Sequence, residues 1–436
     1  MVKLKSFLLV GIIFLGFLLR FHHYDQCPRH GATFDEFAWT WQGMSLWQTG
    51  IPTSWSPHPQ YKNFQIKNFQ GALVRLVTPY LEHPPLFGLI AGGFALITGS
   101  KQLFDIALGQ IRVLALVLGT TSIWLVFLVA KKLYGVIIGL LSAMLYATAP
   151  TIVIGSRIVQ NENFFIPAFL IIWLIILNYL ESQKPWQRNL AAALAGLLTL
   201  AKIPWAAATV ALCLLMASKK RFKDMLIIGA IALSIFSLYF IYGAVYDWST
   251  FINLWGLQTA RAKIGLGNTL ALFTHPYLLD RLYPDGWLYW GWLSLAILST
   301  KFKKHSLLLI PVIAYFLVFI LAIPGIEAQG WYRYPFYPFL MIAGAAVLEK
   351  IIKKPSLLNL AFFFLIAATA WHWGWEEIFG MPNWLFRAIV LLGFASFLPT
   401  LWWPEKFPRL ARRATHFWLV IFILLNIASV VAHVHS

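Results

Sequence analysis

Long apolar runs, separated by short polar or basic segments, follow one another along almost the whole chain. About 20 consecutive apolar residues form a helix long enough to cross a bilayer. We interpret as crossings the runs 4–21, 106–130, 136–155, 163–180, 189–203, 205–217, 225–245, 286–300, 305–323, 334–349, 356–372, 384–402 and 416–433. The pattern predicts an all-α polytopic membrane protein with about 13 transmembrane helices.

Lysine and arginine residues cluster in alternate turns between these runs, for example at Lys131/Lys132 and in the group 219–223. Short cytoplasmic loops of membrane proteins carry an excess of Lys and Arg, so these turns are expected in the cytoplasm. The N-terminus, with Lys3 and Lys5, then lies inside the cell, and the C-terminus lies outside.

The apolar stretch 84–99 begins at Pro84-Pro85, is interrupted by glycines and is short for a crossing. If 106–130 runs inward to Lys131, both ends of 84–99 must lie outside. We therefore expect a re-entrant or interfacial helix, which is tolerated only where protein covers its ends.

The composition supports a membrane protein. The chain is 60% hydrophobic and only 11% charged, against about 25% charged residues in soluble domains, which excludes a water-soluble globule. The net charge of +18 arises from separate clusters rather than one basic stripe, so nucleic acid is not an expected partner. Cys27 and Cys213 are far apart in the sequence, and no disulfide is expected.

We expect a single membrane-embedded domain over residues 1–436. Its catalytic part would be 1–345, with outer loops 22–105 and 246–285. Residues 346–436 would form the C-terminal transmembrane helices.

The first outer loop contains adjacent acids, Asp35 and Glu36, at the start of a predicted amphipathic helix that ends at Gly50. A structural explanation is available for both acids. Thr33 and Glu36 have the spacing of a capping box, and Asp35 would complement the helix dipole. The alternative is that the pair is catalytic.

The second candidate is the segment Tyr80-Leu-Glu82-His83-Pro84-Pro85. An acid and an imidazole beside a helix N-terminus suit an anion such as phosphate. His83 could instead simply cap the helix.

Further charged residues on the same predicted face are Arg157, Glu162, Lys202, Arg261, and Arg333 with Tyr334. Each has a structural alternative: an ion pair for Arg157 and Glu162, snorkelling for Lys202, and interface anchoring for the others. Zinc-site spacings and nucleotide-binding or nucleophile motifs are absent from the sequence. No metal site is predicted.

The order of these pieces resembles the GT-C membrane glycosyltransferases. An acidic pair follows the first crossing, then come YLEHPPL, an Arg/acid turn, a Lys before Pro, and a late RYPFYP run. The closest resemblance is to the branch with protein O-mannosyltransferases and lipid A aminoarabinose transferases, over about residues 1–345. It implies a polyprenyl-phosphate sugar as donor and an active site on the extracytoplasmic face.

The resemblance also implies roles for single residues. Asp35 matches the catalytic acid of the DE motif, and Glu82 and His83 match the positions before PPL. Arg261 and Tyr334 match positions that contact the donor phosphate. Glu162 matches an acid of the second outer loop, although its surroundings, Gln-Asn-Glu-Asn, depart from the family pattern.

The leaving group of such a donor is already a phosphate anion and needs no protonation. The site therefore needs one carboxylate as general base and cations for the phosphate. Asp35 is the predicted base. The candidates for the phosphate are His83, Lys202, Arg261, Arg333 and Tyr334. No cofactor is expected, and a divalent cation is not expected to be essential.

The predicted function is transfer of a monosaccharide to an acceptor hydroxyl or phosphate on a lipid, glycan or protein. The alternatives are a transporter or flippase, or a polymerase or ligase, of lipid-linked sugars. The expected location is a prokaryotic plasma (inner) membrane. The sequence names neither the sugar nor the acceptor.

Overall fold

The computed structural model describes residues 2–29, 34–260, 269–270, 272, 285–323, 330–370, 380–403 and 406–433. Helices dominate these residues, which confirms the predicted all-α class. In the first half of the chain the helices are α1 (Val2–Phe21), α2 (Asp35–Thr49), α3 (Leu86–Ile97), α4 (Leu108–Tyr134), α5 (Val136–Thr148), α6 (Pro150–Gly155), α7 (Asn161–Ser182), α8 (Pro185–Thr199) and α9 (Ala206–Ser218).

The remaining helices are α10 (Phe222–Phe236), α11 (Leu238–Tyr246), α12 (Trp248–Ala260), α14 (Gly286–Ser299), α15 (Phe302–Ala322), α16 (Tyr337–Lys353), α17 (Leu358–Ala370), α19 (Asn383–Trp402) and α20 (Pro408–Ala432). Three short 3-10 helices also occur: η1 (Leu103–Asp105), η2 (Ile203–Trp205) and η3 (Gly330–Phe336).

Every predicted crossing coincides with a helix or a pair of helices. The run 136–155 is divided into α5 and α6 at Ala149-Pro150, and 225–245 is divided into α10 and α11 at Ser237. Among the described residues, seven helices are long and apolar enough to cross a membrane, and five shorter helices are apolar. The fold is thus polytopic, and the count of thirteen crossings stays a prediction.

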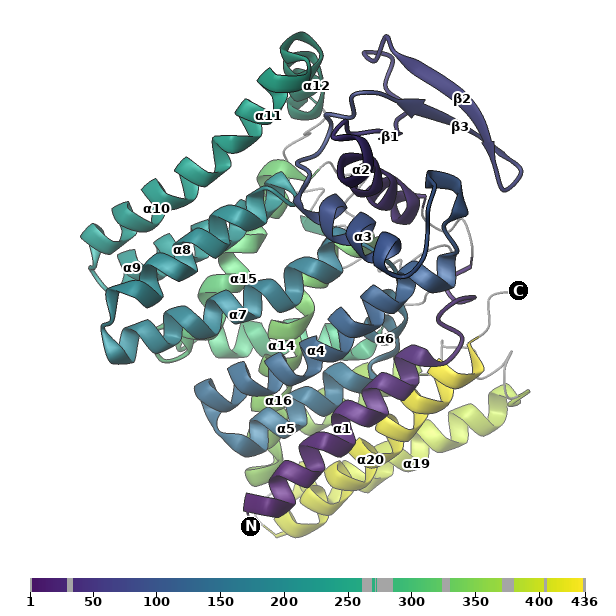
Figure 1. The fold of residues 1–436 in the computed structure, drawn as a ribbon. Coiled ribbons are helices and arrows are strands. Elements are labelled where there is room, and N and C mark those ends of the chain that lie inside the picture. Colours follow the sequence, from purple (N-terminus) through teal and green to yellow (C-terminus); the bar gives the residue numbers. More distant parts are fainter. Residues whose placement is uncertain are drawn as a thin grey trace.

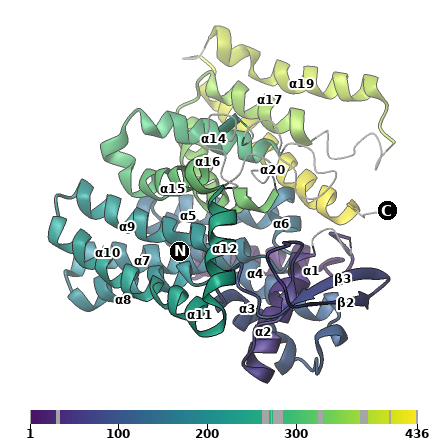
Figure 2. The ribbon, with the colours of Figure 1, turned by 90° about the horizontal axis from the view of Figure 1, so that it is seen from above.

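The most buried of these spans lies in the centre of the bundle. This span comprises η3 and α16, and 83% of its 18-residue apolar stretch is buried inside the protein. Figure 2 shows α16 between α14, α15 and α5. Close contact with α14 depends on Gly291, because a Cβ there would lie 2.6 Å from the Cβ of Leu340.

Helices α2 and α3 pack tightly against each other at one end of the bundle, together with the strands and α12 (Figure 1). Their backbones touch at glycines. A Cβ on Gly43 would lie 1.7 Å from the carbonyl oxygen of Gly88, and a Cβ on Gly92 would lie 2.1 Å from the nitrogen of Met44. The predicted short helix in 84–99 is therefore present and packs on another helix, as the re-entrant or interfacial interpretation requires.

A small sheet, which the sequence pattern did not predict, lies between α2 and α3 in the chain. Strands β1 (Ser54–Trp55), β2 (Phe64–Phe69) and β3 (Ala72–Val77) are antiparallel, in the order β1-β3-β2. One face packs on the protein, because Phe69, Val74 and Leu76 are buried. Phe69 makes edge contacts with Phe37 and Trp41 of α2.

Candidate active site

The adjacent acids Asp35 and Glu36 at the start of α2 point to different partners, since consecutive helical residues project about 100° apart. Both carboxylate oxygens of Glu36 accept hydrogen bonds from Arg112 of α4, at 3.0 and 2.8 Å. The backbone N–H of Val159 donates to Glu36 as well, at 2.9 Å. Thr33, the other residue of the suggested capping box, lies outside the described residues. Among the described residues, the Glu36 carboxylate ties α2 to α4 and to the segment before α7.

Arg112 also donates hydrogen bonds to the segment that directly follows α1. Its Nη1 donates to the carbonyl oxygens of Tyr24 and Pro28, at 2.9 and 2.7 Å. Both Arg112 and Glu36 are almost completely buried. A bidentate pair with all these bonds is the geometry in which a buried ion pair offsets its desolvation.

Asp35 is only partly buried and has a different environment. Its Oδ2 accepts a hydrogen bond of 3.2 Å from the side-chain amide of Gln160. Burial raises the pKa of Asp35, the charge of Lys202 and the Gln160 bond oppose that rise, and the charge of Glu36 adds to it. The net result is a carboxylate that accepts protons more readily than an ordinary aspartate.

The segment that presents Gln160 is a polar turn buried inside the protein. All four residues of Gln160-Asn-Glu-Asn163 are buried. The indole N–H of Trp39 donates to the side-chain oxygen of Gln160 at 3.3 Å, and that of Trp205 donates to the side-chain oxygen of Asn161 at 2.7 Å. These bonds orient the turn, because a buried polar group without a partner would cost free energy.

Glu162 in this turn pairs with Lys202, the residue before η2. The Lys202 Nζ lies 2.7 Å from Glu162 Oε1, and both side chains are buried. The same Nζ lies 4.2 Å from the centroid of the Tyr332 ring. The Glu162 carboxylate and the face of the Tyr332 ring both favour the positively charged form of Lys202.

A cavity of about 350 Å³ lies beside Lys202. Its polar lining includes Glu82, His83, Lys202 and Tyr332, together with Gln258 and Thr259 of α12. Its apolar lining comes largely from α11, α12 and the end of α15, and includes Tyr239, Phe251, Trp255, Leu321 and Ile323. The cavity can thus hold a molecule that joins a charged group to a hydrocarbon chain.

The segment with Glu82 and His83 is held from several sides. Tyr239 and Tyr242 of α11 donate to the carbonyl oxygens of Leu81 and Tyr80, at 2.9 and 3.1 Å. The backbone N–H of Leu86 donates to Leu200, at 2.9 Å, which ties the start of α3 to the end of α8. The His83 ring lies 4.9 Å from that of Trp39. His58 lies 3.5 Å from Glu82, close enough for an ion pair when the imidazole is protonated.

Two of the predicted site residues lie elsewhere. Arg157 donates to the carbonyl oxygens of Leu19 and Cys27, at 2.7 and 3.3 Å, and thereby holds the end of α1. It does not form the ion pair with Glu162 that was the alternative interpretation, because Lys202 takes that place. Arg333 lines a separate, very small cavity beside Asp285.

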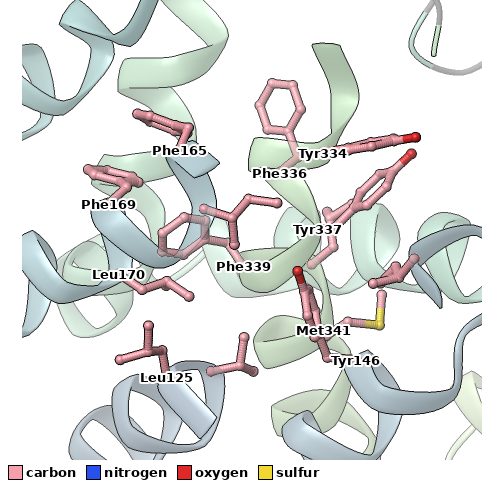
Figure 3. Close-up of a cluster of buried hydrophobic side chains, with 14 of the residues drawn as sticks. Leu125, Tyr146, Phe165, Phe169, Leu170, Tyr334, Phe336, Tyr337, Phe339 and Met341 are labelled. Carbon is pink, nitrogen blue, oxygen red and sulfur yellow. The ribbon is translucent and has the colours of Figure 1, made fainter. Parts of the chain in front are cut away.

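Tyr334 is buried and its hydroxyl has no hydrogen-bond partner in the described part of the chain. Figure 3 shows it beside Tyr337 and Phe336, with Phe165 and Phe169 of α7 on the far side of Phe336. It does not line the 350 Å³ cavity. Arg261 lies outside the described residues.

Arg112, Gln160 and Tyr239 were not recognised from the sequence. Arg112 does carry a usable signal, since an arginine inside an apolar run marks a buried partner or a functional site. Gln160 and Tyr239 carry no such signal, because their roles depend on contacts with distant segments. Within the described residues, no group of three or more His, Cys, Asp or Glu side chains is placed to hold a metal ion.

Comparison with known proteins gives one family match. Residues 82–242 match the family of dolichyl-phosphate-mannose-protein mannosyltransferases. This range contains Glu82, His83, Glu162 and Lys202. No curated protein has a significantly similar sequence.

The fold resembles that of ArnT from Cupriavidus metallidurans bound to undecaprenyl phosphate. The TM-score is 0.57 at 13% identity, over 99% of this chain and 77% of that chain. It also resembles the apo oligosaccharyltransferase of Archaeoglobus fulgidus, with a TM-score of 0.50 at 13% identity, over 94% of this chain and 56% of that chain. The predicted resemblance to the GT-C membrane glycosyltransferases is confirmed by the family match over 82–242 and by the shared polytopic helical fold.

Proposed function

We propose that the protein transfers a monosaccharide from a polyprenyl-phosphate donor to an acceptor hydroxyl or phosphate, with Asp35 as general base. The observation that carries this proposal is the cavity beside Lys202, which combines a charged lining with an apolar one. A polyprenyl phosphate has the same two parts. The bound undecaprenyl phosphate of ArnT supports a lipid phosphate as ligand of this fold.

In the proposed reaction, the acceptor oxygen forms a bond to the anomeric carbon while the bond from that carbon to the phosphate oxygen breaks. The polyprenyl phosphate leaves as an anion, and Asp35 takes the proton of an acceptor hydroxyl. A raised pKa makes Asp35 a better base for this step. An acceptor phosphate would attack as an anion and would need no base.

Lys202 and His83 are the proposed contacts for the departing phosphate. Both line the cavity, and the contact with Glu162 holds the Lys202 ammonium in place before the donor arrives. A cation held in place before the reaction stabilises developing charge without a reorganisation cost. Arg261, which lies outside the described residues, stays a predicted phosphate contact, whereas Arg333 and Tyr334 do not line this cavity.

We further propose that turnover does not require a divalent cation, because the leaving group is a monophosphate ester and lysine and histidine can neutralise it. Transfer should continue after dialysis against EDTA. Complete loss of transfer, with recovery on addition of Mn²⁺ or Mg²⁺, would contradict this.

The proposed reaction takes place on the extracytoplasmic face. The N-terminus lies at the end of the bundle opposite α2, α3 and the strands (Figure 1), and its lysines are expected in the cytoplasm. Reporter fusions at Ser100 and Ser436 should both behave as extracytoplasmic. A cytoplasmic signal at Ser100 would overturn this arrangement.

The test of the function is product analysis by mass spectrometry. The purified chain is incubated with a panel of polyprenyl-phosphate pentoses and hexoses and with lipid, glycan and peptide acceptors. We expect an acceptor that gains one sugar residue, and Asp35→Asn as the matched inactive control. A ladder of several added residues would instead indicate a polymerase. Transport of the intact donor across liposomes without any product would indicate a flippase.

A further inference from the structure

A second cavity, of about 440 Å³, lies at the other end of the bundle from the candidate active site. It is formed where α4, α7 and α9 end and where α10 and α15 begin. These are turns that carry basic clusters and that we expect in the cytoplasm.

The lining of this cavity carries an excess of positive charge. Lys132, Lys219 and Arg221 face one acid, Glu181. Lys132 pairs with Glu181 at 2.8 Å, and Glu181 is 69% exposed, so water weakens that pair. The ammonium of Lys219 has no ion-pair or hydrogen-bond partner in the part of the chain that the structure describes.

Helix dipoles explain only part of this charge. Lys132 lies in the last turn of α4, where a cation is favourable. Arg221, by contrast, immediately precedes the first residue of α10, where the helix N-terminus favours an anion. Arg221 is bonded to Asp224 and to the Tyr179 hydroxyl, which hold its guanidinium beside the cavity.

Apart from Gln183, the rest of the lining consists of four leucines, among them Leu177 and Leu180. A soluble phosphate would gain nothing from them, whereas an acyl chain would bury its surface against them. Basic pockets between transmembrane helices at the cytoplasmic side bind anionic lipid head groups. We propose that this cavity binds an anionic phospholipid, with its phosphate at Lys219 and Arg221 and an acyl chain along the leucines.

The test is native mass spectrometry of the full chain with phosphatidylglycerol or phosphatidylcholine added to the micelles. Phosphatidylglycerol should bind more tightly to the wild type. The Lys132→Gln/Lys219→Gln variant should bind it about 25-fold more weakly, at about fivefold per lysine. The matched control Lys303→Gln/Lys304→Gln removes two lysines outside the cavity lining and should stay within about twofold of wild type.

A third variant, Glu181→Gln, should bind phosphatidylglycerol more tightly than the wild type. Damage to the fold would not produce such a gain in binding. Equal losses in the double variant and its control would mean diffuse surface charge and would overturn the proposal. So would equal binding of phosphatidylcholine by the wild type, or displacement of phosphatidylglycerol by excess inorganic phosphate, which would indicate a soluble anion as ligand.

Discussion

The two most buried ion pairs of the described residues lie at one end of the bundle, and pairs with a strongly exposed side chain lie at the other. At the end with α2 and α3, Glu36–Arg112 and Glu162–Lys202 have side chains that are at most 6% exposed, and they join residues 76 and 40 positions apart. At the other end, Lys132–Glu181 and Glu349–Lys353 each have one side chain about 70% exposed. Exposed pairs contribute about 0–1 kcal/mol, whereas buried pairs need complete hydrogen bonding to offset desolvation.

The exposed pairs and the buried pairs hold different parts of the protein in place. The exposed pairs lie in turns whose basic residues orient the chain in the membrane. The buried pairs hold α2 against α4 and the polar turn against Lys202, and Asp35 lies within electrostatic reach of both Glu36 and Lys202. A fixed frame around Asp35 is what its proposed role as general base requires.

The largest effect on stability is expected from Glu36→Ala. It leaves the Arg112 guanidinium buried without its acid, and breaking a buried pair in this way costs about 3–5 kcal/mol. Thermal unfolding of the purified protein should show a large fall in Tm. The double variant Glu36→Gln/Arg112→Met should recover much of it, and a double variant as unstable as Glu36→Ala would show that the pair does not hold the fold.

The next effect is on donor binding. Lys202→Met, combined with Glu162→Gln so that no buried carboxylate is left without its cation, should weaken binding of polyprenyl phosphate by about 10- to 100-fold, since a hydrogen bond to a charged group contributes about 1.5–3 kcal/mol. Titration with the lipid phosphate measures this, and Lys303→Met, at the exposed start of α15, is the matched control. Unchanged binding by this double variant would remove Lys202 from the phosphate site.

The pH profile should show the raised pKa of Asp35. A general base works only when deprotonated, so kcat/KM falls about tenfold per pH unit below the pKa of Asp35. An ordinary aspartate has a pKa of 3.8, and burial raises the pKa of Asp35 above that value. The fall in kcat/KM should therefore begin at a higher pH than it would for an ordinary aspartate. The residual kcat/KM of Asp35→Asn should not show this fall at acid pH. If the fall persists in that variant, it belongs to the titration of another group.

The smallest effect is expected at the exposed end. Lys132→Gln should change the free energy of unfolding by about 0–1 kcal/mol and leave the transfer rate unchanged. Thermal unfolding and rate assays on this variant complete the comparison. A loss as large as that of Glu36→Ala would mean that exposure does not distinguish the two classes of pair.

The sequence predicted the helices well because a membrane crossing imposes an apolar length that is visible without any partner. The sheet 54–77 was missed, since β2 and β3 are six residues long and β2 is mostly exposed. The candidate site was predicted in part: Glu82, His83 and Lys202 do line one cavity. The roles of Glu36 and Arg157 could not be predicted, because their partners, Arg112 and the end of α1, are distant in the chain.

The central claim is that Asp35 is the base and Glu36 is structural. The direct measurement is the transfer rate, donor affinity and Tm of Asp35→Asn and Glu36→Gln, side by side. Asp35→Asn should transfer the sugar about 10²–10⁴-fold more slowly, with normal donor affinity and Tm. Glu36→Gln should have a lower Tm and retain much of the transfer rate. A near-normal rate for Asp35→Asn, or a larger loss of rate for Glu36→Gln at unchanged Tm, would contradict the claim.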